Sequence, residues 1–330
     1  MADKGEATIS EMNRLLAEGP LSGVYLFYGP EEYFKDFYCN KIKEKTVGTD
    51  ILNYTKYTVK TDPAEVIRNC SGYPMFADWK MIVLCESGFF CGKADPGGLT
   101  DFLGDLPSST VLVFRESQAD KRSKLYKAVE RNGVIFHCDR QSDEMIIKLL
   151  AKAARAQERG ITKEAAQLMI LGLGEDMQRL LSELNKLVLL TAPGDVIGET
   201  HVREVCTLSI SAKIWDLTDA IAENHKEKAY IYLSSLLDAR EAPQMILFSV
   251  TKAFMNLYNA KMLQAEGMKF HEIASALGSR GFVVKKMCQQ ARKFSAKELS
   301  ARIEFCIRMD EASKTGKIQA VRALELIVAK

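Results

Sequence analysis

The segment from Gly23 to Asp36 constrains the fold of this chain more than any other. Five consecutive apolar or aromatic residues, Val24 to Tyr28, predict a strand buried in a parallel sheet. A turn at Gly29-Pro30 follows, and the residues after it have the pattern of a helix. Strand, glycine turn and helix is the arrangement of a phosphate-binding loop, whose signature is G-x-x-x-x-G-K-[ST]. The segment therefore predicts the architecture of a nucleotide-binding domain.

Two positions of this signature carry residues that oppose nucleotide binding. When the signature begins at Gly29, Lys35 falls on its lysine, but Phe34 replaces the second glycine and Asp36 replaces the hydroxyl residue. The Phe34 side chain obstructs backbone amides that would surround a phosphate, and Asp36 adds a negative charge beside the phosphates. We interpret the loop as one that keeps the architecture of an ATPase without its chemistry. The alternative is an ordinary strand-turn-helix with a chance lysine.

The composition is typical of a globular protein of two or three domains. The chain has 330 residues, and its formal net charge of +2 neither requires nor excludes a polyanionic partner. Its eight cysteines form no C-x-x-C pair and its four histidines are dispersed, so we expect no metal site. No apolar run reaches the roughly 18 residues that span a membrane. Because the N-terminus also lacks a signal-peptide core, we expect a cytoplasmic protein without membrane contact.

Strands and helices alternate in the first part of the chain. Apolar or β-branched runs predict further strands at 51–59, 81–85, 110–114 and 134–136. Helical patterns lie between them, one starting after the Asp62 cap and one running from Lys121 to Arg131. This alternation predicts a parallel sheet with helices on both faces.

Beyond about residue 140 the sequence predicts helices only. The first four of these form a small helical region, at 142–157, 162–173, 175–190 and 199–206. Apolar residues at helical spacing then continue from Ala212 to the C-terminus. The fold class is therefore α/β plus all-α.

An ATPase-like α/β domain, a small helical lid and a helical C-terminal domain is the layout of clamp-loader subunits of the AAA+ class. Within that class, the chain resembles the delta subunit of the bacterial DNA polymerase III clamp loader over nearly its whole length. Six segments carry the resemblance in the family's order and spacing: 24–31, 73–76, 120–125, 174–187, 291–295 and 310–316. It implies a RecA/AAA+-like domain with a degenerate phosphate loop at 1–140, a helical lid at 141–211 and a helical collar for oligomerisation at 212–330.

The resemblance also implies a function. In that family the subunit binds the ring-shaped sliding clamp, or beta subunit, and holds one interface of the ring open without hydrolysing ATP. Implied partners are the clamp, the ATPase and delta-prime subunits contacted through the collar, and primed DNA within the replicative assembly. Cys85 replaces a magnesium-positioning acid, Gln178 replaces a phosphate-sensing arginine, and the Ser-Arg-Cys triplet of related subunits is absent. We therefore expect no catalytic site and no cofactor, in an accessory subunit of a DNA-directed DNA polymerase.

The family's clamp-binding wedge is a pair of apolar residues just before the third strand, and here the pair matches Met75 and Phe76. Turn residues in this loop are interleaved with large apolar side chains, more than loop chemistry requires. Tyr73, Pro74 and Trp79 flank the pair and are explained equally well by packing. Trp79 also departs from the basic residue that the family usually places there. The alternative is that all these side chains cover the edge of the sheet.

A basic cluster in the C-terminal region could contact DNA phosphates. It comprises Lys285, Lys286, Arg292 and Lys293. Because acidic and basic residues are mixed elsewhere along the chain, a solvated helical face is the favoured interpretation.

Two other functions stay open. One is a nucleotide-binding AAA+ ATPase subunit of a DNA-processing complex, which micromolar binding of magnesium-ATP would favour. The other is a DNA-binding helical adaptor that makes no contact with the clamp.

Overall fold

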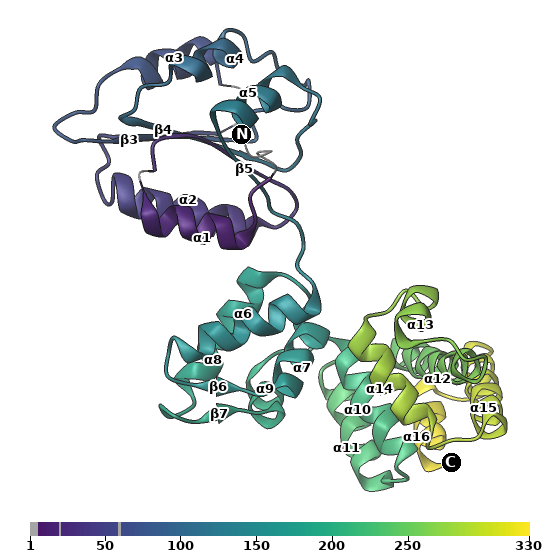
Figure 1. Ribbon diagram of the computed structural model, residues 1–330. Helices are drawn as coiled ribbons and strands as arrows, with labels where there is room; N and C mark the ends of the chain where they lie inside the picture. Colours follow the sequence, from purple (N-terminus) through teal and green to yellow (C-terminus); the bar gives the residue numbers. More distant parts are fainter. Residues whose placement is uncertain (1–5, 20, 59–60) are drawn as a thin grey trace. The chain divides into compact units, whose positions relative to one another are not determined.

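The computed structural model describes residues 6–19, 21–58 and 61–330, and it divides the chain into two compact units. The first unit comprises Met1–Ser142 with Asp176–Gln178, and the second comprises Asp143–Glu175 with Arg179–Lys330. The first contains a parallel sheet, and the second consists mainly of helices (Figure 1). The finer division into three domains at residues 140 and 211 stays a prediction.

The first unit is built on a five-stranded sheet whose paired strands are all parallel. Its strand order is β2-β3-β4-β1-β5, with β1 at Gly23–Tyr28, β2 at Tyr54–Thr58, β3 at Lys80–Cys85, β4 at Thr110–Glu116 and β5 at Gly133–His137. The three central strands are almost fully buried, as expected for a parallel sheet covered on both faces.

Helices cover both faces of this sheet. Figure 1 shows α1 (Ile9–Glu18) and α2 (Glu32–Thr46) on one face, and α3 (Pro63–Ser71), α4 (Leu99–Phe102) and α5 (Lys124–Asn132) on the other. The 3-10 turn η1 (Leu103–Asp105) follows α4 and contacts α5. Side chains of β1 alternate between the two faces. Leu26 packs into the core under α3, α4 and α5, whereas the Phe27 ring lies 6.2 Å from that of Tyr38 on α2. The predicted α/β class of this part is confirmed.

Four helices follow the sheet domain: α6 (Asp143–Arg155), α7 (Lys163–Leu173), α8 (Met177–Leu189) and α9 (Glu199–Val205). The prediction of helices only beyond residue 140 is wrong, because β6 (Gly160–Ile161) and β7 (Val196–Ile197) form a parallel pair. Two residues per strand are too few for an alternating pattern to reveal them.

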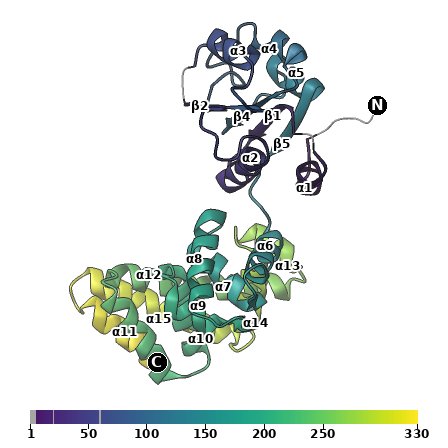
Figure 2. The same cartoon turned by 90° about the vertical axis from the view of Figure 1, so that its left-hand side faces the viewer.

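Seven helices complete the second unit (Figure 2): α10 (Ile210–Ala222), α11 (Lys226–Asp238), α12 (Pro243–Ala265), α13 (Phe270–Ala276), α14 (Gly281–Ala291), α15 (Ala296–Lys314) and α16 (Ala320–Ala329). The long helix α12 contacts α10, α14, α15 and α16. Its buried side chains, such as Leu247, Phe254 and Leu257, lie in one apolar core with residues of those helices. The predicted helical C-terminal region is therefore confirmed.

Two element boundaries differ from the sequence predictions. The strand predicted at 51–59 begins only at Tyr54, because Ile51 and Leu52 lie in a turn, and Val59 falls outside the described residues. Helix α5 begins at Lys124 rather than Lys121, since the Ser123 hydroxyl caps it by accepting a hydrogen bond from the Tyr126 amide at 3.2 Å. Among the described residues, no helix is both long enough and apolar enough to cross a membrane.

Gly29 joins β1 to α2 and cannot be replaced without strain. Its φ of +125° lies in the region that favours glycine. A Cβ at this position would lie 2.5 Å from the carbonyl oxygen of Cys138, beyond the end of β5. The contact between two backbone segments therefore requires this glycine, with no phosphate involved.

We expect Gly29→Ala to lower the free energy of unfolding by about 1–3 kcal/mol, because the strained φ and the backbone contact both oppose a side chain. Urea unfolding monitored by circular dichroism measures the change. Gly104→Ala is the control, since a Cβ there meets nothing within 4 Å. Equal midpoints for the two variants would contradict the steric argument.

Candidate functional site

Lys35, the lysine of the degenerate phosphate loop, is engaged by the protein itself. Its side chain is 1% exposed, and Nζ donates hydrogen bonds to the carbonyl oxygens of Gly29 at 2.8 Å and Glu116 at 3.2 Å. Nζ also lies 2.5 Å from Oε1 of Glu32. An ammonium group has three donors, so these three oxygens match its full capacity. Lys35 ties the loop to the end of β4.

Phe34 and Asp36, the other two unusual residues of the loop, also contact groups within the protein. Phe34 is buried, and its ring stacks 6.3 Å from that of Tyr38 and lies edge-on to Phe136. Asp36 forms an ion pair with Nη1 of Arg115 at 2.6 Å, and Nη2 of Arg115 forms a second ion pair with Glu32 at 3.3 Å. Glu32 and Asp36 thus pair with the Lys35 and Arg115 cations at this end of the sheet.

The neighbouring strands β3 and β4 end in a partly buried cysteine and a buried glutamate. Cys85, which replaces an acid at the end of β3, has a pKa raised by burial. Glu116, at the end of β4, accepts hydrogen bonds from the Ser87 amide at 3.0 Å and from the Ser87 hydroxyl, and burial raises its pKa. Gln178 is exposed in the first turn of α8. Among the residues that the structure describes, no group of His, Cys, Asp and Glu could hold a metal ion.

The predicted wedge, Met75 and Phe76, lies at the opposite edge of the sheet from the phosphate loop. It belongs to the loop between α3 and β3, which enters β3 at its amino end, whereas the phosphate loop leaves β1 at its carboxyl end. Met75 is 54% exposed and Phe76 is fully exposed, at 102%. Tyr73 is also exposed, whereas Pro74 and Trp79 are partly buried. The two side chains therefore do not cover the sheet edge, although clamp contact itself stays a prediction.

The backbone beneath the wedge is fixed by a buried asparagine. Asn53, just before β2, accepts a hydrogen bond from the Met75 amide at 2.7 Å through Oδ1. Its Nδ2 donates to the Met75 carbonyl oxygen at 2.8 Å. Asn53 is only 5% exposed, so it is part of the fold rather than of the surface.

Lys80, the first residue of β3, secures the start of the same loop. Its Nζ donates to the carbonyl oxygens of Gly72, at 2.9 Å, and Asn69. Burial lowers the Lys80 pKa. Phe76 itself has a φ of +55°, which is unusual for a residue other than glycine. The loop thus holds exposed apolar side chains on a fixed and locally strained backbone.

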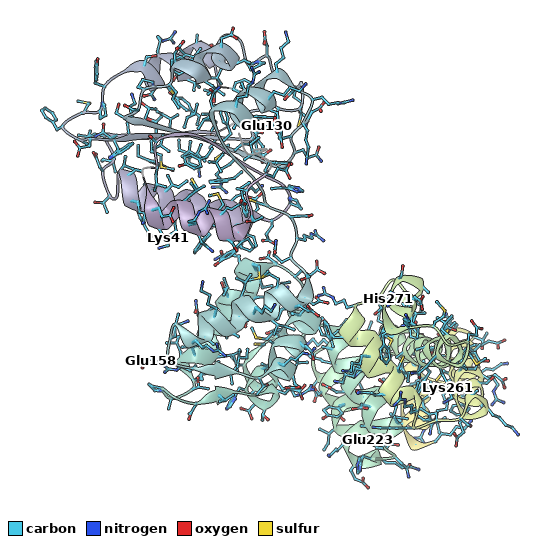
Figure 3. The ribbon with its side chains drawn as sticks, viewed as in Figure 1. Lys41, Glu130, Glu158, Glu223, Lys261 and His271 are labelled. Carbon is cyan, nitrogen blue, oxygen red and sulfur yellow. The ribbon has the colours of Figure 1, made fainter. Side chains whose placement is uncertain are left out.

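The basic cluster is partly neutralised. Nζ of Lys293 lies 2.7 Å from Glu223, labelled in Figure 3, and 3.6 Å from Asp219, and the Glu223 carboxylate raises the Lys293 pKa. Nζ of Lys286 lies 5.5 Å from the centre of the Trp215 ring. Lys285 and Arg292 are exposed. A DNA contact through these four residues stays a prediction.

Sequence reasoning missed three residues that organise these sites: Asn53, Lys80 and Arg115. Asn53 fell within a predicted strand, where asparagine is disfavoured, and this was a usable signal that the strand begins later. The predicted strands began after Lys80 and ended before Arg115, so neither residue was placed on the sheet. Their partners are remote in sequence, and no local pattern identifies them.

Two family models match the chain. Residues 25–139 match the model described as DNA polymerase III, delta subunit. Residues 211–330 match the model described as DNA polymerase III delta subunit, C-terminal domain. Together they cover most of the chain, including the degenerate phosphate loop and the wedge.

Similarity to individual proteins extends over nearly the full length. The DNA polymerase III subunit delta of Bacillus subtilis is 23% identical over 325 residues, which cover 95% of this chain and 94% of that protein. A solved structure of the Bacillus subtilis DNA clamp loader delta protein aligns with a TM-score of 0.57 at 23% identity, covering 98% of both chains. This structural likeness shows a shared fold. Because the two family models together match most of the chain, it belongs to the DNA polymerase III delta subunit family.

Proposed function

We propose that this member of the delta family binds the sliding clamp through Met75 and Phe76 and holds one interface of the ring open, while neighbouring subunits supply nucleotide-driven motion. One observation carries the proposal: two exposed apolar side chains stand on a backbone that Asn53 fixes at both hydrogen-bonding groups of Met75. A fixed backbone lowers the entropic cost of binding, because the loop is already ordered before the partner binds.

Burial of this pair provides enough free energy to bias the ring. Full burial of a Met or a Phe side chain contributes about 1.5–3 kcal/mol each. The wedge can open the ring only by its differential affinity for the open and closed states. If the wedge fits better when the adjacent ring interface is distorted, about 1.4 kcal/mol of preference shifts the equilibrium tenfold toward the open ring.

We expect the double substitution Met75→Ala with Phe76→Ala to abolish clamp binding in a surface-plasmon assay while leaving the circular dichroism unchanged, because both side chains are exposed. The matched control is Leu189→Ala with Leu190→Ala, two adjacent apolar residues that are 85% and 70% exposed. Full-strength binding by the Met75/Phe76 variant would refute the proposed contact.

We also propose that the chain neither binds nor hydrolyses ATP. Support comes from the lysine of the loop, which already has three oxygen partners, and from the Phe34 ring that fills the position of the second glycine. A nucleotide would have to displace charge-assisted hydrogen bonds and then meet Glu32 and Asp36. The alternative function of an ATPase subunit requires that exchange to be favourable.

Two measurements test this part. Titration of magnesium-ATP into the isolated chain should show no micromolar binding. Lys35→Met should lower the free energy of unfolding by about 1–3 kcal/mol, since two buried carbonyl oxygens lose their donor. Lys41→Met, which removes an exposed ion pair on the same helix, should cost less than about 1 kcal/mol. Micromolar nucleotide binding that Lys35→Met removes would favour the ATPase alternative.

Assembly with other loader subunits is supported by a stripe along α12. The stripe consists of exposed residues whose separation along the helix alternates between three and four positions. They are Met245, Phe248, Lys252, Met255, Asn259 and Met262. This is the seven-residue period with which one helix packs along another. Because the opposite face of α12 already lies in the core, the stripe has the pattern of a second helix-packing surface. We propose that a helix of a neighbouring loader subunit covers it.

We expect Phe248→Glu to reduce incorporation into the reconstituted loader by roughly tenfold or more, because a carboxylate replaces the apolar centre of the stripe. Sizing chromatography with the purified ATPase and delta-prime subunits measures incorporation, and clamp binding by the isolated chain should stay unchanged. The control is Ile231→Glu on α11, where the native side chain is 66% exposed, similar to Phe248 at 59%. Equal incorporation of both variants would contradict the assignment of the stripe.

A further inference from the structure

Two large apolar side chains in the turn next to the wedge loop are mostly exposed rather than packed into the core. Ile51 is 83% exposed and Leu52 is 65% exposed, in the turn between α2 and β2. Their sequence favours a strand, but pairing in the sheet begins only at Tyr54. Packing therefore does not explain why this turn carries an isoleucine and a leucine.

The parallel sheet brings this turn next to the wedge. Strands β2 and β3 are neighbours, with Tyr54 opposite Met81, so the segments that enter them lie at the same edge. Neighbouring strands are about 4.8 Å apart. The Met81 amide donates to the Asn53 carbonyl oxygen at 2.8 Å, while the Asn53 side chain binds both backbone groups of Met75. Leu52 is thus one residue away from the group that holds the wedge.

The turn is as firmly held as the wedge. Asp50 accepts a hydrogen bond from the Leu52 amide at 2.8 Å through Oδ1, and from Nδ2 of Asn53 at 2.6 Å through Oδ2. These bonds orient the Asn53 amide and fix the backbone under Leu52. The hydrogen bond from Asn53 is also the main cause of the lowered Asp50 pKa. Asp50 and Asn53 therefore join the two exposed apolar pairs into one rigid surface.

We propose that Ile51 and Leu52 form a second apolar contact with the sliding clamp, and that Asn53 is the positioning residue that sets the two contacts at a fixed separation. This inference rests on the proposed function of Met75 and Phe76. A partner that buries the wedge is brought against the adjacent turn, because the two segments share one sheet edge and one hydrogen-bond network.

The area that a stable interface needs also points to the clamp as the occupant. A stable interface buries about 800 Å² on each partner, whereas one aromatic side chain buries only about 150–250 Å². Two wedge side chains therefore provide roughly 300–500 Å², which falls well short of that area. Tyr73, which is 92% exposed in the wedge loop, adds a third side chain, and Ile51 and Leu52 add two more on the same hydrogen-bonded support.

The first test uses the full-length chain and its purified clamp on a surface-plasmon chip. We expect Ile51→Ser with Leu52→Ser to weaken binding by about tenfold to a hundredfold, mainly through faster dissociation. Thermal unfolding should not change, because the native side chains are exposed. Leu189→Ser with Leu190→Ser is the matched control and should bind as the native chain does.

The second test separates positioning from general stability. Asn53→Ala should weaken clamp binding at a temperature far below its unfolding midpoint. Combined with Phe76→Ala, its effect should be less than additive, because positioning matters only while the wedge side chain is present. An effect of Asn53→Ala that is strictly additive with that of Phe76→Ala would overturn the positioning role.

The outcomes distinguish this inference from the function on which it rests. Native affinity in the Ile51/Leu52 variant, together with loss of binding in the Met75/Phe76 variant, would overturn the second contact and leave the wedge intact. Retained binding in the Met75/Phe76 variant would overturn the proposed function itself. Weakened binding in both variants, with native binding in the Leu189/Leu190 control, supports the two-contact surface.

Discussion

At the carboxyl end of the sheet, hydrogen bonds from the Lys35 ammonium join the loop after β1 to the end of β4. A buried cation is tolerated only where oxygen acceptors replace water, and here the acceptors come from the loop itself and from the end of β4. The lysine therefore connects β1, α2 and β4 within the protein. In this chain the lysine of the loop contributes to the fold through these contacts, whether or not a nucleotide is bound.

The exposed apolar segments lie at the opposite edge of the sheet, where the strands begin. All five strands are parallel, so every segment that enters a strand lies at the edge opposite the phosphate loop. Met75 and Phe76 occur in one of these segments and Ile51 and Leu52 in another. In the described sheet β2 is the outermost strand and pairs with β3, so the two segments that enter these strands adjoin each other. A binding surface there requires no nucleotide-dependent change in the loop around Gly29.

The sequence predicted the long periodic elements well. Helix α15 lies in the predicted helical C-terminal region and begins at Ala296 because Ser295 and Glu298 form a capping box. The start of β2 was predicted wrongly, since Ile51 and Leu52 have strand propensity but Asp50 holds them in a turn. Met75 and Phe76 were identified by resemblance rather than by pattern. The role of Asn53 depends on the register between two strands, which is a non-local property that residue spacing does not carry.

Phe76 combines two features that oppose stability of the isolated chain. Its side chain is fully exposed, and its φ of +55° costs of order 1 kcal/mol for a residue other than glycine or asparagine. The hydrogen bonds of Asn53 and Lys80 hold the loop in this conformation despite both costs. Strain of this kind is expected where a backbone is ordered in advance for a partner. A flexible loop would avoid the strain, but it would have to be ordered each time a partner binds.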